Sequence, residues 1–188
     1  MGQEVEVFPE QHTFTVDDVM RMVEAGILDA DDHVELLDGV LRPMSPQGPA
    51  HSALAVRFRR RLEALLGDRA HLRDHSNIQL GDRNLPEPDI AVVRGHEDDY
   101  FHRLPNGEDV PLIVEISVTS QRRDRDKMRL YARFGIAEYW ILDVPARTLT
   151  VCRGPNEEGY TRTAMLRPDE EVAVPGTDVR WSVAELLP

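Results

Sequence analysis

One apolar run limits the fold more than any other feature. Residues 112–118 read Leu-Ile-Val-Glu-Ile-Ser-Val, and Glu115 is the one charge within them. A nearly continuous apolar run of this length is typical of a strand that is covered on both faces. Residues 122–134 then show helical periodicity, ended by Gly135, and residues 138–143 form another strand-like run. This order predicts a βαβ-like unit within an α/β or α+β domain.

The other patterns predict a mixed central sheet flanked by helices. Asp38-Gly39 between two apolar runs is a strong hairpin signal, and Thr15 is placed as the N-cap of a first helix. The polar stretch 94–111 has a length typical of a functional flap or a disordered loop. Further helices are expected over 51–67 and 183–187, and further strands over 72–80, 89–93, 148–152 and 160–166.

Size and composition indicate one domain. The chain has 188 residues, of which 41% are hydrophobic, so residues 12–188 are expected to form a single domain behind a flexible leader, residues 1–11. No apolar run approaches the roughly 18 residues of a membrane span, and the N-terminus lacks the pattern of a secretory signal. The lone Cys152 excludes an internal disulfide and a zinc site built from cysteines. We therefore expect a cytoplasmic protein with no membrane partner.

The charged residues hold a second constraint. The formal net charge is −12, the wrong overall sign for a protein that coats itself in nucleic acid. Of the 22 basic residues, 21 are arginine, and Lys127 is the single lysine. Arginine replaces lysine at most solvated positions, but not where a compact ammonium with a tunable pKa is needed. Lys127 is therefore expected to have a chemical role, with drift in composition as the alternative.

Two carboxylates occupy positions where charge is expensive. Glu115 interrupts the apolar strand, and a buried lone carboxylate costs several kcal/mol unless it is paired, protonated or metal-bound. Asp89 follows Pro88 at the start of another strand, and the 26 residues between the two acids allow a return to a neighbouring strand. Two carboxylates that converge at one sheet edge make an all-oxygen site suited to Mg²⁺. A buried Glu–Arg pair is the alternative interpretation.

Several segments with distinctive residues follow one another in a fixed order and spacing along the chain. They are residues 34–39, Met44-Ser45-Pro46 with His51, residues 86–90, residues 113–117, and the run from Asp124 to Asp143 that holds Lys127, Leu130-Tyr131-Ala132 and Gly135. Together they resemble the PD-(D/E)XK nuclease superfamily, and most closely its Uma-two-like branch of restriction endonucleases. The superfamily lysine expected two residues after the glutamate is Ser117 here. In the branch this position is commonly serine, and a lysine from the next helix, matched by Lys127, replaces it.

The resemblance implies a restriction-endonuclease-like fold and a mechanism. It implies hydrolysis of DNA phosphodiester bonds by water activated on Mg²⁺, with Mn²⁺ as a substitute. Asp89, Glu115 and the backbone carbonyl of Ile116 would hold the ion. Lys127 would orient the water or stabilise charge on the phosphorus.

Other residues have two interpretations each. Glu35 could complete the site through a metal-bound water or be a solvated strand residue, and His51 could belong to the site or be a surface histidine at a helix end. Tyr131 could line the site with Ser117, or belong to the core. The arginines of the helix over 122–134 could face a phosphate backbone. Alternatively, they form the solvated face of that helix and pair with Asp124 and Asp126. These arginines are Arg122, Arg123, Arg125, Arg129 and Arg133.

Two other functions remain open at this stage. The net charge and the displaced lysine fit a catalytically inactive nuclease-fold module that binds nucleic acid or protein. A phosphoesterase that acts on a smaller substrate is the third hypothesis. A homodimer is possible, because two cuts on a duplex are most simply made by a twofold pair.

Overall fold

A six-stranded mixed sheet forms the centre of the computed structural model, which describes residues 12–29, 32–118 and 121–188, without the side chains of 121–126. The strand order is β3-β4-β5-β6-β7-β8. Neighbours are antiparallel except β5 and β6, which are parallel. The predicted mixed sheet in a single domain is confirmed. The strand bounds are β3 Ala70–Asp74, β4 Ile90–Arg94, β5 Leu112–Ser117, β6 Glu138–Asp143, β7 Thr148–Asn156 and β8 Gly159–Leu166.

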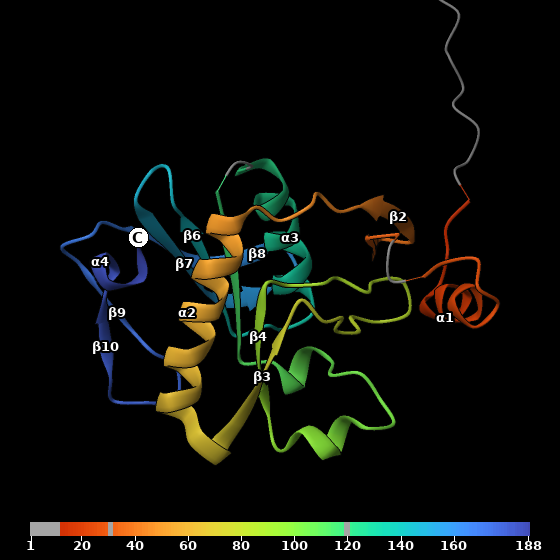
Figure 1. Cartoon of the computed structure of the whole chain (residues 1–188), viewed down its shortest axis with the longest axis horizontal. Helices are drawn as coiled ribbons and strands as arrows, with labels where there is room; N and C mark the ends of the chain where they lie inside the picture. The colour runs from red at the N-terminus through yellow and green to blue at the C-terminus, as the bar shows by residue number, and fades with distance from the viewer. Residues whose placement is uncertain (1–11, 30–31, 119–120) are drawn as a thin grey trace, which may run out of the picture.

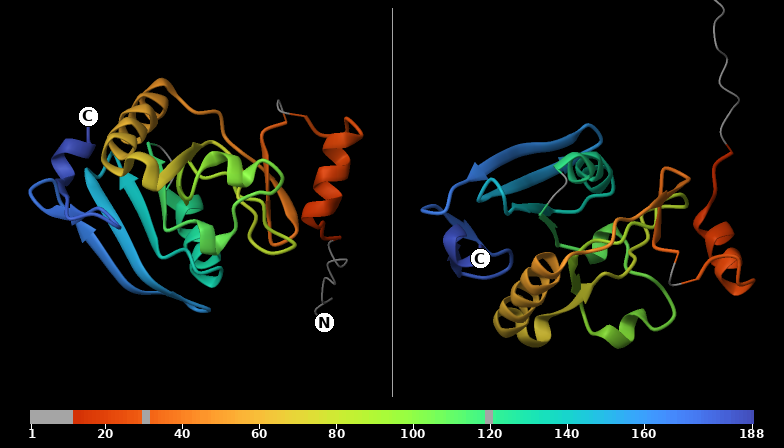
Figure 2. Two further views of the ribbon diagram at one scale, coloured as in Figure 1. Left: turned by 90° about the horizontal axis from the view of Figure 1, so that it is seen from below. Right: turned by 45° about the horizontal axis from the view of Figure 1, so that its top comes forward.

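Helices cover both faces of this sheet, as Figure 2 shows. Helix α2 (Pro49–Leu66) packs on one face and helix α3 (Gln121–Arg133), which connects β5 to β6, packs on the other. Strand β5 is buried on both sides, because Val114 and Ile116 contact the α2 side while Ile113 contacts the α3 side. Side chains alternate along a strand, so Glu115 points to the α3 side, as Ile113 does.

The N-terminal elements lie at one end of the molecule (Figure 1). Helix α1 (Val16–Glu24) begins with the predicted Thr15 cap, and Asp18 completes a capping box. The predicted hairpin is β1 (Val34–Leu37) and β2 (Val40–Pro43), and its turn residues Asp38 and Gly39 have φ of 49° and 78°. Two successive positive φ angles define a type I′ turn, which is why Asp-Gly is favoured there.

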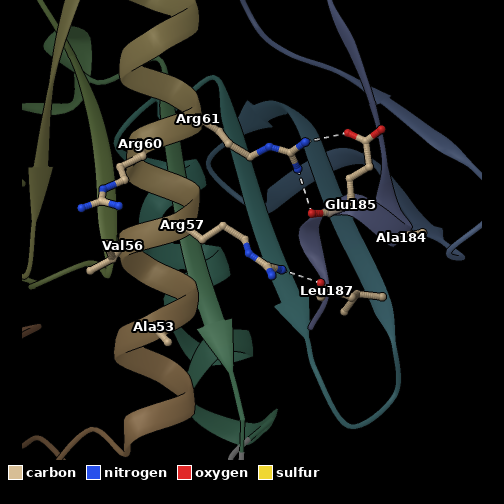
Figure 3. Close-up of a pocket in the computed structure, with 8 residues that line it drawn as sticks. All are labelled: Ala53, Val56, Arg57, Arg60, Arg61, Ala184, Glu185 and Leu187. Carbon is tan, nitrogen blue, oxygen red and sulfur yellow. Dashed lines mark hydrogen bonds and ion pairs between the residues drawn. The ribbon is translucent and has the colours of Figure 1, made fainter.

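The C-terminal segment packs against α2. It contains a two-stranded sheet, β9 (Glu171–Ala173) with β10 (Arg180–Ser182), followed by helix α4 (Val183–Leu186). Arg57 Nη1 donates to the carbonyl of Leu187 at 2.7 Å, and Arg61 bonds the carbonyl and the carboxylate of Glu185 (Figure 3). These arginines therefore hold the end of the chain on α2. Within the described part of the chain, no helix is long and apolar enough to cross a bilayer.

The strand predicted over 72–80 is wrong in its second half. Strand β3 ends at Asp74, and His75 has a φ of 45°, so the backbone leaves the strand there. Ile78 and Leu80 are nonetheless fully buried on the α3 side of the sheet. The alternating apolar residues thus reflect burial from a loop rather than a hydrogen-bonded ladder.

The long polar stretch 94–111 is ordered by internal contacts, which differs from the disorder that its length allowed. It contains two short 3₁₀ turns, η2 (Glu97–Tyr100) and η3 (Gly107–Asp109), and Tyr100 is buried against the α3 side of the sheet. The Tyr100 hydroxyl donates to the carbonyl of Arg94 at 2.8 Å, and Arg103 pairs with Asp109 at 2.6 Å. Internal contacts of this kind account for the order of a long polar loop.

Candidate active site

Strand register brings the two predicted carboxylates together. Strands β4 and β5 are antiparallel with Ile90 opposite Val114, so Asp89, one residue before β4, lies beside Glu115. The Asp89 amide donates to Glu115 Oε2 at 3.4 Å. The Ile116 amide, which lies beyond the first residue of β4, donates to Asp89 Oδ2 at 2.7 Å. Both carboxylates are buried, with 8% of Asp89 and 4% of Glu115 exposed.

Helix α3 adds two groups that contact Glu115. Lys127 and Tyr131 are four residues apart, so they lie on the same face of the helix. Lys127 Nζ donates to Glu115 Oε1 at 3.3 Å, and the Tyr131 hydroxyl donates to the same oxygen at 3.1 Å. Two donors on one oxygen fix the carboxylate of Glu115 in a single orientation.

Glu35 comes to the same place from the N-terminal hairpin. It is buried on β1, and its Oε2 lies 2.9 Å from Lys127 Nζ. The contact is an ion pair without the directional geometry of a hydrogen bond. Burial alone would lower the pKa of Lys127, but the carboxylates of Glu115 and Glu35 outweigh it and raise that pKa. The ammonium therefore stays charged across the neutral pH range.

The cleft around these groups has a volume of about 750 Å³ and carries an excess of negative charge. Among the described residues that line it, Lys127 is the one cation against four carboxylates. Burial and the nearby Glu35 raise the pKa of the Glu87 carboxyl, as expected where acids outnumber their partners. The lining includes His33, Glu35, Met44, Gln47, His51, His75, Glu87, Asp89, Glu115, Ile116, Val118 and Lys127.

Two histidines and an amide surround the other side of Asp89. His51, in the first turn of α2, has Nε2 2.8 Å from Asp89 Oδ2. His75 Nδ1 lies 3.8 Å from Asp89 Oδ1. Gln47 Nε2 lies 2.8 Å from His75 Nδ1 and 3.4 Å from Asp89 Oδ1. His51, His75 and Asp89 can each offer one ligand atom to a common point, and these atoms lie within 4.8 Å of one another.

The structure brings most of the residues named from the sequence to this cleft. Asp89, Glu115, Lys127, Glu35 and His51 line it. Tyr131 is fully buried, as a core residue is, and its hydroxyl also contacts Glu115 of the site. Both interpretations of Tyr131 therefore hold. Ser117 is buried at the end of β5, outside the described lining of the cleft. The side chains of Arg122, Arg123 and Arg125 lie outside the described part of the chain.

Glu87, His75 and Gln47 are among the residues of the cleft that were not proposed from the sequence. Glu87 had a signal, because it stands in the Pro86-Glu87-Pro88-Asp89 segment that carries the family resemblance. His75 had none, since it lies in the middle of a segment that was predicted to be a strand. Gln47 lies in the proline-rich loop before α2, where an amide gives no signal of its own.

A mixed sheet whose neighbouring strands present an aspartate and a glutamate beside a lysine defines a protein of the PD-(D/E)XK nuclease class. The chain belongs to the family described as "Uma2: Putative restriction endonuclease", whose model matches residues 16–184. The chain is also similar in fold to a protein from Anabaena variabilis described as "a putative nuclease belonging to DUF820". That similarity has a TM-score of 0.72 and 19% sequence identity, and it covers 92% of this chain and 97% of the other. No match was found among curated proteins.

Proposed function

We propose that this protein is a divalent-metal-dependent endonuclease that hydrolyses phosphodiester bonds of DNA. The observation that carries the proposal is the meeting of Asp89, Glu115 and Lys127 at one cleft. Membership of a family described as restriction endonucleases supports the same reaction class. Asp89, Glu115 and Lys127 are proposed as the catalytic residues.

The donor set fits a hard divalent cation. Asp89 and Glu115 offer carboxylate oxygens, and the N–H of Ile116 already faces Asp89. The N–H and C=O of one strand residue point to the same side of the strand, so the Ile116 carbonyl points to the side of β5 on which Asp89 lies. Mg²⁺ prefers oxygen ligands and keeps several waters, and Mn²⁺ accepts the same ligands. A divalent ion would also offset the excess of carboxylates in the cleft, and Glu35 would reach it through water.

The ion, when bound, lowers the pKa of a coordinated water and polarises the phosphate oxygen. The protein's own groups fix the geometry. Ile116 and His51 hold Asp89 in one rotamer, while Lys127 and Tyr131 hold Glu115. Lys127 remains protonated, so it would stabilise negative charge on the phosphate rather than accept a proton.

The proposed substrate is duplex DNA, although the net charge of the chain is −12. Binding must therefore depend on the metal and on local positive charge rather than on the whole surface. The positive charge is proposed to come from three arginines that precede Lys127 on α3, namely Arg122, Arg123 and Arg125.

A twofold dimer would supply one active site for each strand of the duplex. Sedimentation with and without DNA tests whether the protein forms this dimer.

Cleavage of supercoiled plasmid tests the proposal. The wild-type protein is expected to cut in Mg²⁺ or Mn²⁺ and to stop cutting in EDTA. Asp89→Asn and Glu115→Gln should each lose at least about 100-fold in rate, while Asp68→Asn, which changes an exposed acid outside the cleft, should cut normally.

Other results of this assay would support the other functions. A folded wild-type protein that leaves every nucleic acid intact in both metals would indicate an inactive module. Hydrolysis of bis(p-nitrophenyl) phosphate without cleavage of DNA would indicate a phosphoesterase for a smaller substrate. Cleavage that survives both carboxylate substitutions would indicate a contaminant or a different site.

A further inference from the structure

We propose that His51, His75 and Asp89 form a second metal position that selects a borderline transition-metal ion, such as Zn²⁺ or Co²⁺, over Mg²⁺. This position goes beyond the proposed nuclease function, in which His51 only orients Asp89 and His75 has no role. It shares Asp89 with the oxygen site, and its two histidines come from the first turn of α2 and from the loop after β3.

The three ligand atoms are already gathered. They lie within 4.8 Å of one another, whereas two ligands of one zinc-like ion, each about 2.0–2.2 Å from the metal, lie roughly 3–4 Å apart. Closing that difference needs a shift of side chains only. The groups are also shielded, since 12% of the His51 side chain, 31% of the His75 side chain and 11% of the Asp89 side chain are exposed.

The backbone holds His75 at this place. His75 has a φ of 45°, in a region that residues other than glycine rarely adopt. Its amide donates to the carbonyl of Asp89 at 3.3 Å, which ties the two ligands together through the main chain. Unusual backbone conformations of this kind cluster at functional sites.

Gln47 occupies the lone pairs that such an ion would use. An amide nitrogen can only donate, so Gln47 Nε2 donates to His75 Nδ1 and toward Asp89 Oδ1. His75 Nδ1 therefore presents its lone pair to Gln47 Nε2, at 3.8 Å from Asp89 Oδ1, and not a proton, as a metal ligand must. A bound ion would replace this amide and the proton between His51 Nε2 and Asp89, which passes to solvent.

The ligand types decide which metal fits. Imidazole nitrogen suits Zn²⁺, Co²⁺ and Ni²⁺, whereas Mg²⁺ prefers oxygen and dehydrates reluctantly. Two imidazoles and one carboxylate leave open coordination positions for water. Mg²⁺ is therefore expected to bind at Glu115 and to compete weakly for the position at His75.

Co²⁺ titration of the metal-free full-length protein, followed by visible absorption of the bound ion, tests this proposal without an activity assay. The wild-type protein is expected to bind Co²⁺ in a form that excess Mg²⁺ does not displace. His75→Gln should weaken this binding at least tenfold, while His33→Gln, which changes another histidine of the same cleft, should leave it unchanged. Gln47→Ala should strengthen it several-fold, because the competing donor is removed.

The results separate this proposal from the proposed function. Co²⁺ affinity that is unchanged in His75→Gln, or lost in Glu115→Gln but kept in His75→Gln, would overturn the second metal position. Plasmid cleavage in Mg²⁺ could still occur in either case. Conversely, Co²⁺ binding that depends on His75 in a protein that cuts no DNA would support the second position and contradict the nuclease.

Discussion

Lys127 shows how one side chain can serve both stability and chemistry. It is buried between Glu35 and Glu115, and removing one member of a buried ionic group leaves the others uncompensated, at about 3–5 kcal/mol. Lys127→Met should therefore lower the free energy of unfolding in EDTA by about that amount. Urea denaturation measures the effect, and Mg²⁺ should recover part of it by replacing the lost positive charge.

A double variant controls for this effect. Glu35→Gln together with Lys127→Met removes one carboxylate with the ammonium, so it should be more stable than Lys127→Met alone. Neither protein should cut plasmid DNA, and Lys127→Arg should not restore cleavage, because the guanidinium is wider than an ammonium. A Lys127→Met protein as stable as the wild type in EDTA would contradict the ionic role.

Tyr131 is proposed to act on the site through Glu115 alone. Its hydroxyl is buried and donates to Glu115 Oε1, and burial, followed by the charge of Glu115, raises the pKa of that hydroxyl well above its usual range. Tyr131→Phe keeps the packing and removes one hydrogen bond to a charged group, which costs about 1.5–3 kcal/mol. Mg²⁺ affinity, measured by calorimetry, should fall while the circular dichroism spectrum stays the same. Unchanged affinity would assign Tyr131 to the core alone.

The sequence identified the charged residues of the site better than the polar ones around them. Asp89, Glu115 and Lys127 are detectable because burial of a charge is costly, and because the chain has a single lysine. Nothing in the residue type or spacing of His75 and Gln47 shows that a left-handed residue and a proline-rich loop bring them to Asp89. Their place depends on tertiary structure.

At the scale of elements, arginines hold α4 on α2. Arg61 bonds Glu185 twice and lies 5.6 Å from the ring of Trp181, while Arg60 points away from these groups (Figure 3). Arg61→Ala is expected to cost about 1 kcal/mol and to speed amide hydrogen exchange in residues 183–187. Arg60→Ala is the matched control and should change neither. Equal effects of the two substitutions would show that this contact does not hold the chain end.

Elements were predicted well where local pattern and tertiary packing agree. The hairpin at Asp38-Gly39 and the N-cap at Thr15 depend on turn and cap chemistry that is local. The strand over 72–80 and the loop over 94–111 failed for the opposite reason. In both, residues such as Ile78 and Tyr100 are buried from irregular backbone, and apolar periodicity alone does not distinguish this from a strand or a disordered loop.

At the scale of the whole molecule, the net charge of −12 makes DNA binding a matter of local charge and metal. The Lys127→Met protein, which keeps the carboxylates and is expected not to cut, should bind a duplex in Mg²⁺ and lose most affinity in EDTA. Its affinity should fall as the salt concentration rises. The logarithm of the binding constant should change with the logarithm of the salt concentration by about −0.9 for each phosphate contact. Fluorescence anisotropy measures both. Duplex affinity that does not change with metal or with salt would contradict a cleft that binds DNA phosphates.

The proposed nuclease activity requires one ion shared by two carboxylates from neighbouring strands. Anomalous diffraction from crystals soaked in Mn²⁺ tests this most directly. We expect a peak within about 2.0–2.3 Å of a carboxylate oxygen of Asp89 and of Glu115, and no such peak in crystals of the Glu115→Gln protein. Ordered Asp89 and Glu115 side chains that point away from each other in the Mn²⁺-soaked crystal, with no ion between them, would contradict the account.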